Sequence, residues 1–225
     1  MTPAAIASSL IPYLQQSPAL PAPFFSQLST YLEILLRWNA RTNLTSLRTP
    51  EEIVTRHFGE SLDAAQQIFK VRDPQAGNPQ TLADIGSGAG FPGIPIKLWT
   101  LQVELPLHVT LIESHQKKAT FLREVIRALQ IPGIEIPGIE VQAVRAEQIA
   151  RTFDVVTLRA VENFEEILQT AANLVKPGGR IALLIGEDQI PAAKTALETF
   201  KWKEPTQIPN SHRRVVLLGQ SPGRT

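Results

Sequence analysis

Residues Leu82 to Gly93 read L-A-D-I-G-S-G-A-G-F-P-G, and their spacing points to a ligand site. A short apolar run ends at Asp84, and Gly86, Gly88 and Gly90 then occupy every second position. Glycine lacks a Cβ and tolerates positive φ, so such a loop can turn tightly and expose its N–H groups to a ligand. A buried strand opening into this loop places Asp84 and the glycines where α/β sheets bind ligands.

The glycines alone leave several interpretations open. A structural turn without a ligand is one of them, and a dinucleotide site is another. G-x-G-x-x-G does occur at Gly88, Gly90 and Gly93, but it begins two residues after the turn, and a proline interrupts it. Counted from Gly86, the third glycine is missing, because Phe91 stands there. The pattern therefore favours a nucleotide-like cofactor other than a dinucleotide.

A second acid follows the next expected strand, His108 to Ile112. Glu113 lies a little over twenty residues after the glycine turn, the distance at which an acid holds ribose hydroxyls in nucleotide-binding folds. The alternative is an ordinary acid at a helix start, because an amphipathic helical pattern follows directly.

The elements that position these residues can be read from periodicity. Residues 1 to about 70 are expected to be helical, and a new helix is expected near Thr49-Pro50-Glu51-Glu52. Apolar residues at helical spacing indicate a helix packed into the core rather than an RNA-stacking platform; they are Phe24, Leu28, Tyr31, Leu32 and Leu35.

From Thr81 onward, expected strands alternate with helical stretches, which predicts an α/β fold with a doubly wound, mostly parallel sheet. The later strands are expected at Ile139 to Val144, Asp154 to Leu158, Arg180 to Ile185 and Val215 to Leu218. We therefore expect an N-terminal helical extension over residues 1–70, a linker over 71–80 and a cofactor-binding domain over 81–225.

Composition limits the function. The chain of 225 residues has a formal charge of +1, which argues against binding nucleic acid by bulk charge alone, although residues 192–225 hold six Lys or Arg against two acids. No cysteine is present, so thiolate metal sites and disulfides are excluded, and the four histidines show no metal-ligand spacing. Five prolines among the first 23 residues fit neither a signal peptide nor a membrane span. We expect no metal, no membrane and a cytoplasmic location.

Several motifs together resemble the class I (Rossmann-like) S-adenosylmethionine-dependent methyltransferases, and K-P-G-G-R at 176–180 distinguishes them from dehydrogenases. Three of them resemble, more narrowly, the ribosomal RNA small subunit methyltransferase G family, also called glucose-inhibited division protein B. These are R-W-N-A-R-T-N-L-T at 37–45, R-H-F-G-E-S-L at 56–62 and D-I-G-S-G-A-G-F-P-G-I-P at 84–95. The resemblance implies methyl transfer to guanine nitrogen 7 of 16S ribosomal RNA, as naked RNA or a small-subunit particle, by a monomer.

The resemblance also implies site residues. Gly86 and Phe91 would contact the cofactor, Ala146 and Glu147 would lie at its adenine, and Arg159 would position its carboxylate or an RNA phosphate. Asp84, Gly88, Gly90 and Glu113 are further cofactor candidates, and the candidates for RNA phosphates are Arg37, Arg41, Arg48, Arg56, Arg213 and Arg214. Leu158 and Ile185 depart from the family, which usually has serine and lysine there.

Guanine nitrogen 7 carries a lone pair and no proton, so its methylation needs alignment and exclusion of water rather than a general base. A site without an obvious catalytic His or Cys suits this chemistry. Two alternatives remain at this point: a class I methyltransferase for a small molecule or protein, and a cofactor-binding RNA module without turnover.

Overall fold

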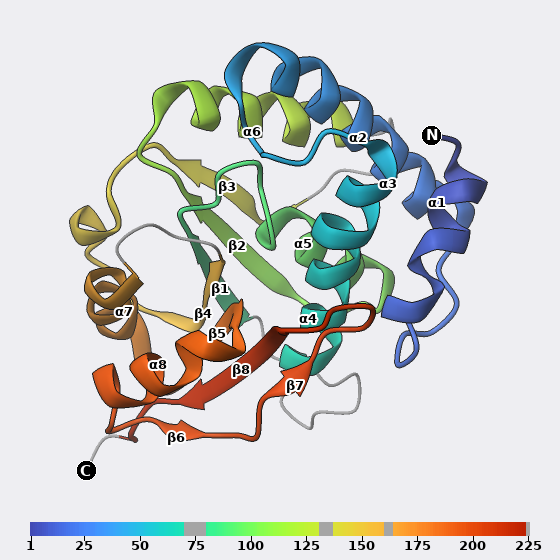
Figure 1. Cartoon of the computed structure of the whole chain (residues 1–225). Coiled ribbons are helices and arrows are strands. Elements are labelled where there is room, and N and C mark those ends of the chain that lie inside the picture. The colour runs from blue at the N-terminus through green and yellow to red at the C-terminus, as the bar shows by residue number, and fades with distance from the viewer. Residues whose placement is uncertain (70–79, 131–136, 160–163, 224–225) are drawn as a thin grey trace.

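The computed structural model describes residues 1–69, 80–130, 137–159 and 164–223, and it has helices on both faces of a central sheet (Figure 1). The strands follow the order β3-β2-β1-β4-β5-β8-β6, and β7 pairs with β8. β1 to β5 are parallel to one another, whereas β8 runs antiparallel to β5. The doubly wound, mostly parallel sheet is thus confirmed. The strands are β1 (Gln80–Ile85), β2 (Leu107–Ile112), β3 (Ile139–Gln142), β4 (Phe153–Arg159), β5 (Val175–Gly186), β6 (Lys201–Trp202), β7 (Thr206–Gln207) and β8 (Arg214–Gln220).

The helices fall into two groups. One group shares a hydrophobic core with one face of the sheet: α1 (Pro3–Leu10), η1 (Ile11–Tyr13), α2 (Ala22–Thr42), α3 (Pro50–Ile53), the π-helical turn η2 (Val54–Gly59), α4 (Glu60–Ile68), α5 (Gly93–Gln102) and α6 (Gln116–Leu129). The other group covers the opposite face: α7 (Phe164–Asn173) and α8 (Ile190–Ala196). Two short 3-10 turns, η3 (Ala146–Gln148) and η4 (Glu187–Gln189), come after β3 and β5. Neighbouring residues of one strand, such as Leu82 and Ala83, enter different cores because side chains alternate across a strand.

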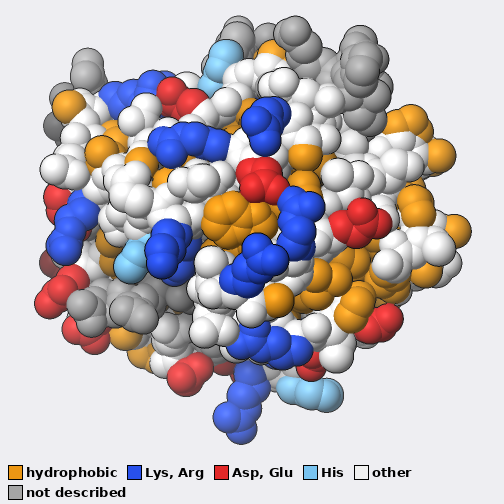
Figure 2. Space-filling model, turned by 90° about the horizontal axis from the view of Figure 1, so that it is seen from above, with side chains coloured by type: hydrophobic (Ala, Val, Ile, Leu, Met, Phe, Trp, Pro, Cys, Tyr) orange, Lys and Arg blue, Asp and Glu red, His pale blue; other side chains and the backbone are white. Residues whose placement is uncertain are grey.

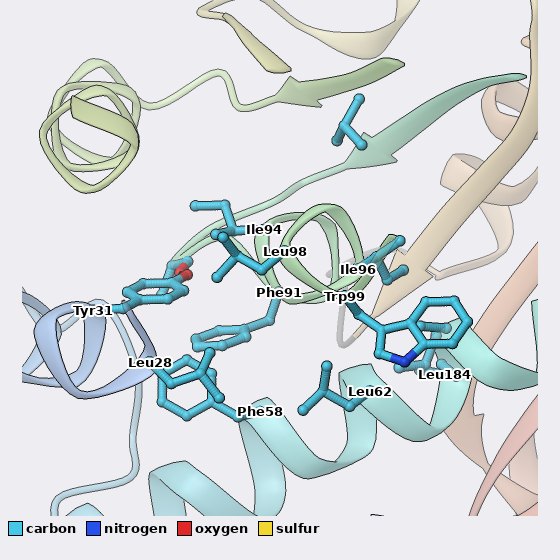
Figure 3. Packing of buried hydrophobic residues seen from close by; sticks show 14 of the residues in the cluster. Leu28, Tyr31, Phe58, Leu62, Phe91, Ile94, Ile96, Leu98, Trp99 and Leu184 are labelled. Carbon is cyan, nitrogen blue, oxygen red and sulfur yellow. The ribbon is translucent and has the colours of Figure 1, made fainter. Parts of the chain in front are cut away.

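The N-terminal helices are part of this core. Phe24, Leu28, Tyr31, Leu32 and Leu35 are all fully buried, which confirms the packing role predicted for them. Figure 3 shows the α2 side chains meeting those of η2, α4 and α5. The expected helix start at Thr49 is also present, because its side chain and that of Glu52 form a capping box.

Three strand expectations need correction. β3 ends at Gln142 and not at Val144, because its partner strand β2 also ends there, with Ile112 opposite Gln142. β5 begins at Val175 and not at Arg180, since the K-P-G-G-R segment is a bulged part of the strand with Gly178 at φ 74°. β8 is longer than expected at both ends. The division into an extension, linker and domain stays a prediction, and linker residues 71–79 lie outside the described residues.

Candidate active-site cleft

A cleft of about 680 Å³ opens where β1, β4 and β5 end. The loop after β1 forms one wall, from Gly86 to Ala89 together with Phe91. Residues 43–47, between α2 and α3, and part of η2 form the opposite wall. Arg159 and Arg214 complete the lining from the ends of β4 and β8. We call the first wall the glycine-loop wall and the second, residues 43–47 and 56–60, the N-terminal wall.

The glycine-loop wall has the backbone that its sequence predicts. Gly86, Gly88 and Gly90 have φ values of 65°, 56° and 87°, a region that side chains with a Cβ rarely adopt. A Cβ on Gly88 would have no neighbour closer than 3.7 Å, whereas one on Gly90 would strike Ile94 at 2.6 Å. Gly88 therefore leaves room for a ligand, and Gly90 leaves room for the core.

Two carboxylates hold this loop from beneath. Glu113 accepts the N–H of Gly88 at 2.9 Å, and Asp84 accepts the N–H of Gly93 at 3.1 Å and the hydroxyl of Thr157 at 2.9 Å. Asp84 is fully buried. Burial raises its pKa to about 6, although the Thr157, Gly93 and Ser87 hydrogen bonds oppose the shift. Asp84 supports the loop and does not line the cleft.

A stack of three rings joins the two walls. Phe91 lies parallel to Tyr31 on one side, with ring centroids 5.3 Å apart, and stacks on His57 on the other at 4.6 Å. Figure 3 shows Phe91 packed among the side chains of α2 and η2. The Tyr31 hydroxyl also donates to the Ala89 carbonyl, so α2 contacts the glycine loop directly. The Arg159 guanidinium also lies over the Phe91 ring, 6.0 Å from its centroid, so Phe91 contacts α2, η2 and Arg159 at once.

His57 belongs to the N-terminal wall and is held neutral. Its Nε2 lies 2.7 Å from the Thr45 hydroxyl. That hydroxyl oxygen accepts the Leu47 N–H, so its own proton is free to donate to the ring. Burial first, and then the positive charges of Arg159 and Arg56, lower the pKa of His57 to about 2. A neutral imidazole is therefore built into the wall.

A buried carboxylate connects the N-terminal wall to the ends of two strands. Glu60 is 1% exposed. One oxygen accepts the Arg214 Nε proton at 2.7 Å and lies 2.6 Å from a terminal nitrogen of that arginine, and the other oxygen accepts Arg159 at 3.2 Å. Arg159 also donates to the Arg56 carbonyl at 2.6 Å. Burial lowers the pKa of Arg159, and the Glu60 charge opposes that effect.

The structure brings only some of the expected cofactor residues together. Gly86, Gly88, Phe91 and Arg159 line one cleft. Ala146 and Glu147 do not, since they line a separate hollow of about 250 Å³ beside α7. The remaining candidates, Asp84, Gly90 and Glu113, lie beneath or beside the glycine loop. Residues 160–163, which follow Arg159, are outside the described residues.

The arginines expected at RNA phosphates differ in their surroundings. Arg56 lines the cleft, whereas Arg41 and Arg213 are simply exposed. Arg37 pairs with Glu124 of α6, Arg48 donates to Asn43 at 2.9 Å, and Arg214 is bound to Glu60. Figure 2 shows the face of the molecule on which α2 and α6 lie in Figure 1. On this face, Lys and Arg side chains surround apolar side chains.

Sequence reasoning did not single out His57, Glu60 or Thr45 as site residues. Both His57 and Glu60 stand in the R-H-F-G-E-S-L motif, and they pair with residues far away along the chain, so only the family resemblance marked them. Within the described ranges no cluster of His, Asp or Glu is able to hold a metal ion. Nor does any described helix have the length and apolar character needed to cross a membrane.

The lining suits a nucleotide-like, zwitterionic cofactor. The glycine loop leaves open space at Gly88, and Arg159 offers cationic donors in the same lining. Glu113 lies behind the loop, and its two oxygens accept the Gly88 and His115 N–H groups. Open backbone and a guanidinium suit a purine nucleoside that bears a carboxylate.

Comparison with known proteins identifies the family of the chain. A family model described as rRNA small subunit methyltransferase G matches residues 25–216. The protein named ribosomal RNA small subunit methyltransferase G from Xanthomonas campestris is 36% identical over 211 residues, which is 90% of either chain. The protein of that name from Roseiflexus castenholzii is 35% identical over 200 residues, 85% of this chain and 81% of the relative.

Solved structures show the same fold at low sequence identity. Magnesium protoporphyrin IX methyltransferase from Synechocystis PCC 6803, solved with bound SAM, matches with a TM-score of 0.62 and 12% identity, covering 85% of this chain and 97% of that one. The ribosomal protein L11 methylase from Lactobacillus delbrueckii subsp. bulgaricus matches with a TM-score of 0.56 and 16% identity, covering 75% and 79%. These likenesses establish the class I methyltransferase fold.

Proposed function

Since the chain belongs to the rRNA small subunit methyltransferase G family, it is an S-adenosylmethionine-dependent rRNA methyltransferase, and we propose that it methylates nitrogen 7 of a guanine in 16S rRNA. The observation that carries the proposal is the cleft itself. It combines an open glycine loop with two partly exposed arginines, Arg159 and Arg214, that share the buried Glu60 carboxylate, and with an exposed Arg56. Family membership decides against the small-molecule and protein substrates, and against a module without turnover.

The cofactor would lie along the glycine-loop wall. Gly86 and Gly88 would let its nucleoside approach the backbone, and Glu113, already bonded to the Gly88 N–H, would accept from the ribose hydroxyls. Arg159 would hold either the cofactor carboxylate or an RNA phosphate. Contacts of Ala146 and Glu147 with the adenine stay a proposal, because those residues line a different hollow.

The proposed reaction does not require an acid–base residue. When bound, S-adenosylmethionine supplies an electrophilic methyl group. Guanine nitrogen 7 has a lone pair and no proton, so no residue has to act as a base. The cleft residues instead orient the two reactants and exclude water. The target guanine becomes cationic when nitrogen 7 is methylated. A neutral His57 in the wall of the cleft adds no positive charge that would oppose this change.

We also propose that the substrate is 16S RNA, free or in an assembling small subunit, and that the enzyme acts as a cytoplasmic monomer. A single chain supplies both walls of the described cleft, as a monomeric enzyme requires. Exposed arginines such as Arg41 and Arg213 would contact phosphates, which position RNA without reading its sequence.

The test is methyl transfer from labelled S-adenosylmethionine to 16S rRNA and to small-subunit particles from cells that lack the enzyme. We expect 7-methylguanosine as the only labelled nucleoside, identified by mass spectrometry. A labelled methyl group on another base atom, or on protein, would contradict the proposal. Comparison of the two substrates decides between naked RNA and the particle, and sedimentation of the active enzyme decides its oligomeric state.

A further inference from the structure

Glu60 is a buried acid that the proposed chemistry does not use. It begins α4, directly after the π-helical turn η2, and it is 1% exposed. An ionised carboxylate at such a position is costly unless it is paired and hydrogen-bonded. Both partners of Glu60 are arginines that line the cleft, and they lie 99 and 154 residues away in the sequence.

The hydrogen bonds fix one side of each guanidinium. Arg214 donates its Nε proton to one oxygen of Glu60 and has a terminal nitrogen in ion-pair contact with the same oxygen. Arg159 donates from one terminal nitrogen to the other oxygen and to the Arg56 carbonyl. A guanidinium has five N–H donors. The other nitrogens of Arg159 have no hydrogen-bond partner among the described residues, and Arg159 lines the cleft, so these donors are available to a ligand there.

The charges explain why an acid is needed at this point. Four cationic side chains line the same cleft, Arg56, Lys118, Arg159 and Arg214, and among its described lining residues Glu60 is the one acid. The Arg159 and Glu60 side chains are only 12% and 2% exposed, so solvent screens them weakly. Without the carboxylate, repulsion from Arg214 and Arg56 would move the Arg159 side chain into another conformation, in which its donors point toward solvent or reach the ligand at a different angle.

We propose that Glu60 is a positioning residue for methyl transfer: by binding Arg159 on one side, it directs the free donors of that arginine into the cleft. The inference rests on the proposed function, because it concerns the ligand that Arg159 holds there. Glu60 is 1% exposed and both its oxygens are bound by arginines, which leaves it little surface for a direct contact with the cofactor or the base. Its effect on the reaction therefore passes through Arg159, and Arg214 serves as the second anchor of the carboxylate.

A double-mutant cycle tests this dependence. Glu60→Gln, Arg159→Gln and the double variant are compared with the wild type in kcat/KM for rRNA and in calorimetric affinity for S-adenosylmethionine. We expect Glu60→Gln alone to lower kcat/KM about 10- to 100-fold, the loss typical of one hydrogen bond between charged groups. In the Arg159→Gln background the same change should cost less than about threefold, because the residue it positions is gone.

Controls separate positioning from folding. Glu140→Gln removes the acid of the exposed Arg151–Glu140 ion pair at β3 and should leave kcat/KM within about twofold of the wild type. Thermal unfolding checks each variant. If Glu60→Gln does not fold, Glu60→Asp keeps the charge, and the shorter side chain should give the same dependence on Arg159.

Equal losses from the Glu60 change with and without Arg159 would overturn the inference, as would a folded Glu60→Gln enzyme with wild-type kcat/KM. The identity of the product nucleoside is read from the wild type in the same assay. A wild-type product other than 7-methylguanosine would count against the proposed function, and the cycle would still report whether Glu60 acts through Arg159.

Discussion

The two walls of the cleft are held together in different ways. In the glycine-loop wall, the carboxylates of Asp84 and Glu113 bind backbone N–H groups 9 and 25 residues away in the chain. In the N-terminal wall, Glu60 depends on partners 99 and 154 residues away. The first wall is therefore a local motif on a strand end, and the second exists only after the helices have packed on the sheet.

This difference predicts that a substitution in the glycine-loop wall lowers the affinity for the cofactor and leaves the rest of the fold intact. Gly86→Val should weaken S-adenosylmethionine binding by more than about 100-fold, because a branched side chain is strained at φ 65° and Gly86 lines the cleft in which we propose that the cofactor binds. Calorimetry on the folded variant measures the affinity.

Gly178→Val is the matched control. Gly178 has φ 74°, and a Cβ added there would have open space around it, but the residue lies in the β5 bulge. The substitution should cost about 1 to 2 kcal/mol of stability and leave cofactor affinity unchanged. Wild-type affinity in Gly86→Val would show that the loop does not bind the cofactor.

The features of the glycine-loop wall could largely be predicted from the sequence, because they depend on residues close together in the chain. The tight glycine turn and the parallel sheet follow from short-range pattern, and both were expected. Asp84 and Glu113 were expected to contact the cofactor, and their hydrogen bonds to the Gly93 and Gly88 N–H groups were not foreseen. The positions of Glu60 and Arg214 were not foreseen either, because no local periodicity tells which distant charges meet. Placing Glu147 at the cleft rested on the resemblance, and its side chain instead lies within 3.5 Å of the Thr170 hydroxyl on α7.

The contributions of Asp84 and His57 to the free energy of unfolding should change with pH in opposite directions. The pKa of Asp84 is raised to about 6 in the folded state from the usual 3.8, so its contribution to stability is present at low pH and is lost as pH rises through 6. Asp84→Asn removes this dependence and keeps an acceptor for the Gly93 N–H. Relative to the wild type, the variant should gain up to about 3 kcal/mol between pH 4 and pH 7.5. Urea unfolding across this range measures the difference, and a constant difference would mean that Asp84 is not titrating as described.

His57 should show the reverse dependence. Its pKa is lowered to about 2 from 6.5, so the stability it contributes is present above pH 6.5 and is lost as the unfolded chain takes up the proton below that pH. His57→Gln keeps a partner for Thr45 but cannot be protonated. Between pH 6.5 and pH 4.5 the wild type should lose about 2 kcal/mol more than the variant. Parallel acid sensitivity of the two proteins would contradict a buried neutral His57.

A smaller effect separates neighbouring arginines at the edge of the N-terminal wall. Arg213 is exposed, whereas Arg214 is bound to Glu60. If Arg213 contacts an RNA phosphate, Arg213→Gln should reduce the salt slope of RNA binding by about one unit. Arg214→Gln should mainly destabilise the fold, by about 1 to 3 kcal/mol. Filter binding across a salt series, with thermal melts of both variants, makes the comparison. Equal salt slopes for Arg213→Gln and the wild type would remove Arg213 from the RNA contacts.

Both walls should enclose one site, and hydrogen exchange of the backbone amides tests this central claim most directly. S-adenosylhomocysteine and an rRNA fragment are added separately and together. We predict slower exchange at residues 86–91 with the nucleoside alone, and additional protection at residues 43–47 and 56–60 when both ligands are present. Protection confined to the glycine loop, even with RNA bound, would show that the N-terminal wall lies outside the active site.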